Sequence, residues 1–298
     1  MEFGKIFSVS SSPRPSPPSD GGEGARRAGE EAVWKPFDRW AAQVDAASLA
    51  VFRILFGLLM AFAMIRFLSN GWVEELYLKP TFFFPFFSWA RPFPAFWMHA
   101  LFVALAVLGA CVAVGFCYRV CITLFFLGFT YVELIDQTTY LNHYYLISLL
   151  SGLMIFLPAH RLWSMDAWLR PSLRADYVGA WALHILRFQF AVVYSFAGLA
   201  KLNRDWLFDA QPLRIWLAAR NDLPLIGPLL DESWLAFVAS WLGAAYDLSI
   251  VFLLCHRRTR PFAFAAVIVF HLATWMLFRI GIFPWIMIVG APLFFSPD

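Results

Sequence analysis

The chain has 298 residues, of which 61% are hydrophobic, 19% aromatic and only 14% charged, and its net charge is +3. One soluble core could not bury that much apolar surface, so the composition excludes an ordinary soluble globular protein. The small net charge, with basic residues spread over short connections, argues against a nucleic-acid partner. We therefore expect a polytopic membrane protein whose main partner is the lipid bilayer.

The beginning of the chain differs from the rest. Residues 8–18 are rich in Ser and Pro, and residues 21–31 are rich in Gly, Ala and charged residues, without apolar periodicity. Such a composition is typical of disorder, and it lacks the apolar core of a secretory signal. We interpret residues 1–34 as a disordered leader and residues 35–298 as a single membrane domain.

Apolar runs recur along that domain. A crossing helix needs about 17 to 25 apolar residues, and eight runs approach this length. They lie near residues 47–67, 97–115, 119–135, 143–159, 180–200, 233–254, 261–279 and 281–296, and the last is short. The sequence thus predicts an all-α integral membrane bundle of about eight transmembrane helices, with residues 72–96 and 201–232 at the interface. Basic residues in alternate connections predict that the N-terminus lies inside.

A polar stripe follows the fifth run. Arg187, Tyr194 and Lys201 are spaced seven residues apart, so a helix places them on nearly one face. His271 and Asp247 lie within later apolar runs. Ionisable groups at membrane depth usually face a bundle interior or a wet cavity. The pattern therefore predicts a polar cavity that opens to the outer side, beyond Lys201.

These residues also have purely structural interpretations. Lys201 could be an anchor that reaches toward the interface, and Asn142 could cap a helix that begins beside His143. His271 has no partner at metal-ligand spacing, which favours hydrogen bonding within the bundle, so no metal is predicted. Arg187 and Asp247 could also neutralise each other or other buried groups.

Several short segments occur in a recognisable order. They are Phe52–Met60, Gly115–Arg119, Asn142 with His143, Ala197–Trp206, Tyr246–Ser249, Phe270 with His271, Leu277–Phe283 and Ala291–Phe294. In this order they resemble the membrane domain of vitamin K-dependent gamma-glutamyl carboxylase and its bacterial relatives, the horizontally transferred transmembrane domain family. The likeness runs from about residue 45 to residue 298.

The resemblance implies an integral membrane enzyme, a carbon-carbon lyase. It would oxidise vitamin K hydroquinone, as reduced menaquinone or phylloquinone, to the epoxide with O2, and would use the base so formed to add CO2 to a protein glutamate. A glutamate-containing protein or peptide would be its partner. The implied location is a bacterial inner membrane, with the mouth of the active site on the outer side.

The resemblance also implies roles for individual residues. Lys201 matches the catalytic base, with His143 assisting, while Asn142 and His271 match positions near the cofactor; Tyr194 and Arg187, from the polar stripe, are added as cofactor-binding candidates. A poorly hydrated mouth penalises the ammonium form of Lys201 and so favours the free amine that a base needs.

The sequence departs from the family pattern at two places. Ala200 stands where the pattern has a basic residue, and Thr274 stands where it has Asn. The alternative function is a non-catalytic membrane protein that binds a quinone or lipid, in an immunity or transport role. Substitution of Lys201 by Arg would distinguish the two, because Arg keeps the charge but scarcely deprotonates.

Overall fold

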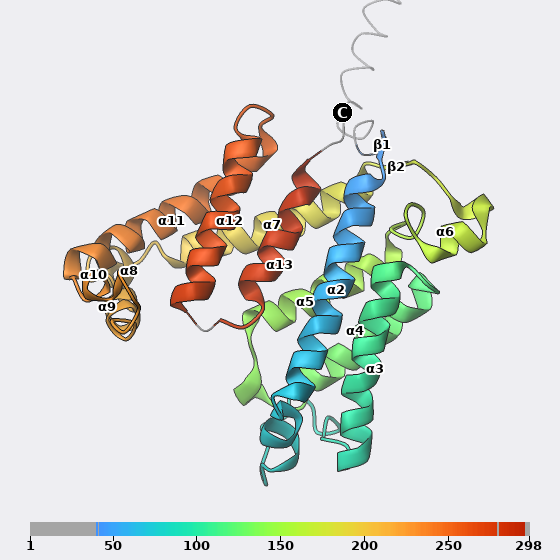
Figure 1. Cartoon of the computed structure of the whole chain (residues 1–298), viewed down its shortest axis with the longest axis horizontal. Helices are drawn as coiled ribbons and strands as arrows, with labels where there is room; N and C mark the ends of the chain where they lie inside the picture. The colour runs from blue at the N-terminus through green and yellow to red at the C-terminus, as the bar shows by residue number, and fades with distance from the viewer. Residues whose placement is uncertain (1–39, 41, 279, 296–298) are drawn as a thin grey trace, which may run out of the picture. The chain divides into compact units, whose positions relative to one another are not determined.

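The computed structural model describes residues 40, 42–278 and 280–295. Residues 42–298 form one compact unit that is almost entirely helical (Figure 1). The all-α fold class predicted from the sequence is thereby confirmed. The predicted leader, residues 1–34, lies outside the described residues.

The unit consists of helices, short helical turns and two short strands. They are β1 (Gln43–Asp45), α2 (Ala47–Ser69), the π-helical turn η1 (Glu74–Leu78), α3 (Ala95–Val114), α4 (Tyr118–Leu134), η2 (Gln137–Thr139), α5 (Asn142–Phe156), α6 (Met165–Leu169), η3 (Pro171–Leu173), β2 (Tyr177–Gly179), α7 (Trp181–Ala200), α8 (Arg204–Leu207), α9 (Leu213–Ala218), α10 (Gly227–Leu230), α11 (Ser233–Cys255), α12 (Arg260–Leu277), α13 (Phe283–Gly290) and η4 (Ala291–Phe294).

Each of the eight predicted apolar runs coincides with a helix. Among the described residues, five helices are long and apolar enough to cross a membrane, namely α2, α3, α7, α11 and α12. Helices α4 and α5 have 17 and 15 residues, and α13 continues into η4 as a short apolar segment. At about 1.5 Å per residue these three are shorter than a bilayer core of about 30 Å. The number of crossings therefore stays a prediction.

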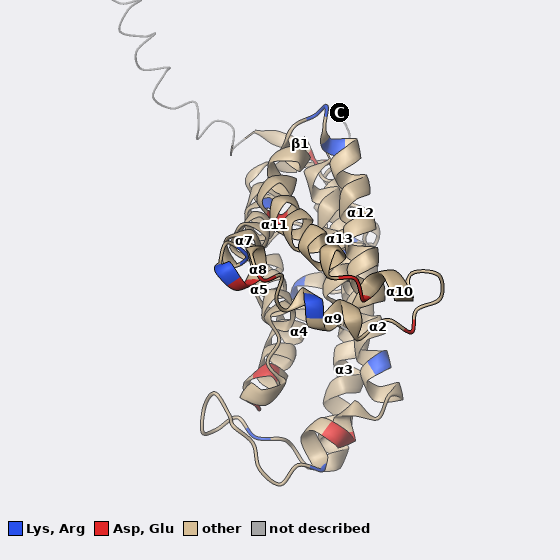
Figure 2. Ribbon diagram, turned by 90° about the vertical axis from the view of Figure 1, so that its left-hand side faces the viewer, with Lys and Arg blue, Asp and Glu red and all other residues tan. Residues whose placement is uncertain are grey.

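The two connections predicted at the interface differ in structure. Residues 201–232 contain the three short helices α8, α9 and α10, whereas residues 72–96 contain η1 followed by an irregular segment before α3 begins. Figure 2 shows that charged residues gather at helix ends and in connections, while long stretches of helix carry none. This distribution suits helices surrounded by lipid, but the interfacial position of the two connections stays a prediction.

The helices pack in two groups that share α13. Helices α2, α3, α4 and α5 pack in succession, and α7 packs along α11, which contacts α12. Helix α13 and η4 contact α2, α7 and α12, and in Figure 1 α13 lies between α2 and α12. Strands β1 and β2 pair antiparallel, with Val44 opposite Val178, just before α2 and α7 begin. Residues from both groups can therefore meet around α13.

A buried arginine ties the first group together. Arg53, in α2, is fully buried. Its Nε donates to the carbonyl of Ala159 at 3.0 Å, Nη1 donates to those of Val112 and Ala113 at 2.9 and 2.6 Å, and Nη2 donates to that of Trp163 at 2.6 Å. Because α3 ends at Val114, the guanidinium supplies a donor to the carbonyl of Ala113, and a second donor to that of Val112, which also accepts from the N–H of Gly115. Arg53 thus joins α2 to the end of α3 and to the segment after α5.

The α3–α4 turn is shaped around that guanidinium. Gly115 has φ of +69°, and a Cβ placed there would lie 2.6 Å from Nη1 of Arg53 and 2.4 Å from Cβ of Ser164. Asp166 accepts hydrogen bonds from the backbone N–H groups of Cys117 and Tyr118 at 2.8 and 2.9 Å, where α4 begins. A carboxylate at a helix N-terminus is favourable. The positive φ of Gly115 and the carboxylate of Asp166 therefore stabilise the turn between α3 and α4.

Candidate functional site

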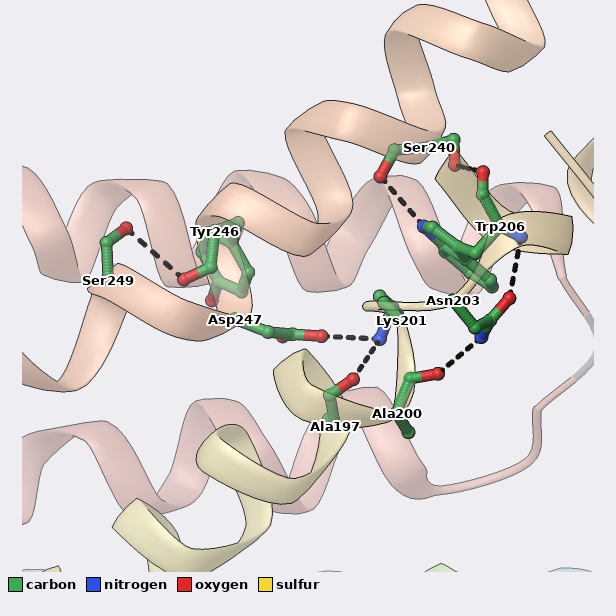
Figure 3. A network of polar contacts seen from close by, with 9 residues as sticks. All are labelled: Ala197, Ala200, Lys201, Asn203, Trp206, Ser240, Tyr246, Asp247 and Ser249. Atoms are coloured by element: carbon green, nitrogen blue, oxygen red, sulfur yellow. Dashed lines mark hydrogen bonds and ion pairs between the residues drawn. The ribbon is translucent and has the colours of Figure 1, made fainter. Parts of the chain in front are cut away.

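Lys201 lies where α7 ends and makes an ion pair with α11. Its Nζ lies 2.5 Å from Oδ2 of Asp247 and donates to the carbonyl of Ala197 at 3.2 Å (Figure 3). The Lys201 side chain is 19% exposed and that of Asp247 is 7% exposed. A charge pair withdrawn this far from water is costly unless each partner satisfies the other. Lys201 is therefore held in place by a partner and does not extend freely toward the interface.

The ion pair requires α7 and α11 to approach closely. At Gly198, one turn before Lys201, a Cβ would lie 2.7 Å from Cδ2 of Leu248 and 3.1 Å from its backbone nitrogen. The missing side chain lets the α11 backbone come near α7 at the residue that follows Asp247. Gly198 thus allows the Asp247 carboxylate to reach the Lys201 amine.

The turn after α7 covers Lys201. Asn203 caps α8, because its Oδ1 accepts from the backbone N–H of Trp206 at 2.9 Å. The indole Nε1 of Trp206 donates to the carbonyl of Ser240 at 2.8 Å, and the Ser240 hydroxyl donates back to the carbonyl of Trp206. The ring centre of Trp206 lies 5.1 Å from Nζ of Lys201, close enough for a cation–π contact. Figure 3 shows this network between the end of α7 and α11.

Next to the ion pair lies a cluster of two tyrosines and a histidine. The rings of Tyr194 and Tyr246 meet edge to face, with centroids 6.0 Å apart, and each lies about 6 Å from the ring of His271. Both hydroxyl oxygens are buried, and among the described residues neither has a hydrogen-bond partner outside this tyrosine pair. His271 Nδ1 lies 2.9 Å from the carbonyl of Val267, so it donates there and leaves Nε2 as an acceptor.

His143 reaches this cluster across α13. The rings of His143 and His271 each lie 6.0 Å from that of Phe283, at the start of α13. Nε2 of His143 is buried and has no partner among the described residues. The capping interpretation of Asn142 is wrong: α5 begins at Asn142 itself, its N-cap is Leu141, and no side chain caps it. The chain is extended at Leu141, so the helix starts one residue earlier than the capping interpretation places it.

Arg187 lies apart from the cluster. Its Nε donates to the carbonyl of Leu293 in η4 at 2.6 Å, and it precedes Lys201 by fourteen residues, which is about 21 Å along a helix. Arg187 and Asp247 do not neutralise each other, because Asp247 pairs with another largely buried group, Lys201. The two ends of the polar stripe on α7 contact different elements, Arg187 contacting η4 and Lys201 contacting α11. The cofactor-binding role of Arg187 stays a prediction.

A small cavity lies in the other group of helices. Its volume is about 20 Å³, enough for one water molecule, and its polar lining comes from Arg66, Tyr77, Glu133 and Tyr144. Oε2 of Glu133 is buried without a partner among the described residues. The sequence predicted a polar cavity around Lys201, whereas this cavity lies between α2, α3, α4 and α5. Tyr144, which follows His143, is its link to the cluster.

Sequence reasoning did not single out Glu133, Tyr246 or Trp206 as site residues. Glu133 could have been identified from the sequence, because it is an acidic residue inside an apolar run. Tyr246 precedes Asp247, but nothing in the sequence shows that it would face Tyr194. Within the described ranges, no group of three or more His, Cys, Asp or Glu side chains is arranged to hold a metal ion.

Comparison with protein-family models identifies the family of this chain. The model of the HTTM domain, the membrane domain of vitamin K-dependent carboxylase-like proteins, matches residues 42–298. No solved structure matches the chain. The matched residues include α2 through η4, and hence every residue of the Lys201 cluster.

Proposed function

This chain belongs to the HTTM domain family, and from that membership together with the Lys201 cluster we propose that it is a membrane enzyme acting on vitamin K hydroquinone. Lys201 is the base that accepts a phenolic proton. The observation that carries the proposal is a largely buried amine paired with Asp247 beside two buried hydroxyls that have no partner outside their own pair among the described residues. Buried ionisable groups beside buried polar side chains mark candidate active sites.

The residues present fit a flat ligand that carries oxygen atoms. Nε2 of His143 is buried without a partner among the described residues, and the buried hydroxyl of Tyr194 has none outside the tyrosine pair. The rings of His271 and Phe283 supply apolar faces between them. Polar atoms without partners are costly inside a protein unless a ligand or water completes them. In the proposal, Tyr194, His271 and His143 hold the hydroquinone, and Asn142, next to His143, supports it.

The protein contributes placement, dryness and one proton acceptor. When bound and oxidised by O2, the hydroquinone supplies a base strong enough to remove the γ-proton of a glutamate, to which CO2 then adds. Lys201 needs a free lone pair for its part. If one proton moves from Nζ to Oδ2 of Asp247, an N–H bond breaks, an O–H bond forms, and the pair stays neutral overall. Lys201 then accepts the phenolic proton while Trp206 keeps water away.

The test is epoxide formation from reduced vitamin K by the purified protein in lipid nanodiscs, without peptide. We expect Lys201→Ala and Lys201→Arg to lower the rate by about 100-fold or more, the usual contribution of a general base. Lys79→Ala is the matched control, because Lys79 pairs with Glu75 at the surface and should leave the rate unchanged. Quinone binding is measured on the same samples. Wild type that binds quinone but forms no epoxide would contradict the enzymatic proposal.

A non-catalytic quinone- or lipid-binding role has one observation in its favour. Lys201 lies within ion-pair distance of Asp247, and a carboxylate stabilises the ammonium form, which cannot act as a base. Under that function Lys201→Arg keeps full quinone binding and no variant forms epoxide. The two functions therefore separate on the same set of proteins.

The chain is an integral membrane protein in a lipid bilayer, and the bacterial inner membrane with an outward-facing site belongs to the proposal. Cys117 and Cys255 are exposed free thiols where α4 begins and α11 ends. Leu225, fully exposed in the loop before α10, would lie on the other side. In intact spheroplasts, a membrane-impermeant maleimide should label Leu225→Cys and spare the two native thiols. The reverse labelling pattern would show that the site faces the cytoplasm.

A glutamate-containing peptide or protein substrate is also part of the proposal.

A further inference from the structure

Two arginines meet at the end of the bundle where α11 ends and α12 begins. Arg187 lies in the second turn of α7, and Arg260 is the first residue of α12. Nε of Arg187 donates to the carbonyl of Leu293 at 2.6 Å, and the guanidinium of Arg260 lies 5.8 Å from the ring centre of Phe295. The two guanidiniums interact electrostatically with each other. Two like charges are therefore held close together where η4 ends.

The positive charge at this end has no acidic partner in the described part of the chain. Neither arginine makes an ion pair there. Residues 180–204 and 248–297, which supply α7, the end of α11, α12 and η4, contain no Asp or Glu. The turn before α12 adds the exposed Arg257 and Arg258, and Figure 2 shows basic residues in blue at this turn. A cluster of one sign attracts an anion.

Both guanidiniums also keep donors that no described residue uses. Arg187 bonds through Nε alone, which leaves Nη1 and Nη2. Arg260 donates from Nε to the carbonyl of Leu254 at 2.9 Å and from Nη2 to that of Cys255 at 3.3 Å, which leaves Nη1. Arg53, by contrast, donates from all three of its nitrogens. Arg187 and Arg260 are both partly exposed, so a ligand can reach the remaining donors.

A phosphate group suits these donors. Guanidinium N–H groups make charge-assisted, often bidentate hydrogen bonds to phosphate oxygens, and a shared anion offsets the repulsion between two cations. The neighbouring Phe188 and Phe262 are exposed, so that lipid chains can contact them. Basic sites between transmembrane helices near the membrane surface are typical of head-group binding. A lipid phosphate therefore gains contacts here that free phosphate does not.

We propose that Arg187 and Arg260 form a binding site for the phosphate of an anionic phospholipid. Arg257 and Arg258 attract the lipid by their charge, while the two partly buried guanidiniums hold the phosphate and so join α7 to α12. This site goes beyond the proposed enzyme and does not depend on quinone chemistry. It gives Arg187 a lipid ligand in place of the cofactor.

The test compares wild type and variants in nanodiscs of phosphatidylcholine with and without phosphatidylglycerol. A ligand that binds the native state raises the melting temperature, so phosphatidylglycerol should raise that of wild type. Arg187→Gln and Arg260→Gln should each lose most of this increment. In native mass spectrometry, each should retain phosphatidylglycerol about tenfold more weakly, the loss expected for one charge-assisted hydrogen bond.

Arg220→Gln is the matched control. Arg220 is also partly exposed and donates from Nη2 to the carbonyl of Met276 at 3.1 Å, near the other end of α12. This variant should keep the full increment and the wild-type retention of phosphatidylglycerol. Each increment is measured within one variant, so a general loss of stability does not affect the comparison.

Four results would overturn the inference. One is wild type that retains phosphatidylglycerol no better than phosphatidylcholine, a measurement that depends on no variant. Another is an equal increment in wild type and in both Gln variants. The third is inorganic phosphate that reproduces the whole increment in phosphatidylcholine nanodiscs, which would make this a site for free phosphate. The fourth is a preference that appears only after residues 296–298 are removed, which would assign the site to the chain's own carboxylates.

Discussion

Arg53 and Lys201 are both buried cations, but they are satisfied in different ways. Arg53 donates four hydrogen bonds, all to backbone carbonyls. Lys201 is paired with the side chain of Asp247 and with one carbonyl. All the acceptors of Arg53 are backbone carbonyls, although Nδ1 of the nearby His160 is buried without a partner among the described residues. The neighbours of Lys201 include two buried hydroxyls that have no partner outside their own pair among the described residues.

The contrast separates a structural charge from a functional one. Backbone carbonyls cannot change protonation state, so the Arg53 contacts only hold α2, the end of α3 and the segment after α5 together. A carboxylate next to an amine can exchange a proton with it. Unsatisfied atoms beside that pair leave room for a ligand to gain hydrogen bonds. Four experiments test whether this separation holds.

The largest expected effect is at Arg53. Arg53→Met removes the guanidinium donors from four carbonyls, of which that of Val112 keeps the N–H of Gly115, and should cost about 4 kcal/mol in the free energy of unfolding. The measurement is denaturation in mixed micelles followed by circular dichroism. Arg258→Met, at an exposed arginine, is the control and should stay within about 0.5 kcal/mol of wild type. An Arg53→Met protein as stable as wild type would show that Arg53 does not stabilise the fold.

The turn at Gly115 gives the next effect. Gly115→Ala places a Cβ against Ser164 and the Arg53 guanidinium at a positive φ, and should cost about 2 to 3 kcal/mol. Gly71→Ala is a close control, because Gly71 has φ of +68° but its added Cβ would make only an ordinary contact, 3.9 Å from Oε2 of Glu74. That variant should lose only about 1 kcal/mol, from backbone strain alone. Equal losses at both glycines would show that contact with Arg53 contributes nothing.

Replacing the Lys201–Asp247 ion pair tests whether that pair serves function more than stability. Lys201→Met leaves Asp247 unpaired and should cost about 2 kcal/mol. Lys201→Met with Asp247→Leu substitutes apolar side chains for both charges and should recover to within about 1 kcal/mol of wild type while remaining inactive. The readouts are thermal melting and epoxide formation. If the double variant is as unstable as the single one, the pair is needed for the fold and the contrast with Arg53 disappears.

The smallest effect is expected at an exposed pair far from either cluster. His99 Nε2 lies 2.6 Å from Oε1 of Glu74 in η1. The pKa of Glu74 is lowered, first by its backbone N–H and then by His99. A lowered carboxyl pKa adds stability above the ordinary value of about 4.3, and that stability is lost as pH falls through the lowered value.

Glu74→Gln should therefore lower the melting temperature at pH 7 by at most about 2 °C. The difference from wild type should disappear below about pH 4. Glu75→Gln, which leaves the His99 contact in place, is the control. A difference that persists unchanged at low pH would show that the effect does not come from the Glu74 charge.

Much of the architecture could be predicted because lipid imposes simple rules on sequence. Apolar runs of nearly crossing length had to be helices, and all eight coincide with helices. Lys201, Tyr194 and His271 were identified because polar residues in such runs are costly. Partners were harder to predict. Asn142 does not cap α5, and Arg187 does not meet Asp247, since local spacing does not report on residues from another helix.

The sequence by itself determined the membrane-embedded helical class, the positions of the helices and the polar face of α7, because each depends on residues close together in the chain. Only the tertiary structure decided that Asp247 meets Lys201, that Tyr246 faces Tyr194, that Arg53 binds four carbonyls, and that the small cavity lies beside Glu133. These contacts depend on how closely helices distant in the chain approach each other. Residues such as Gly198 set that approach, and their effect becomes visible only once both helices are in place.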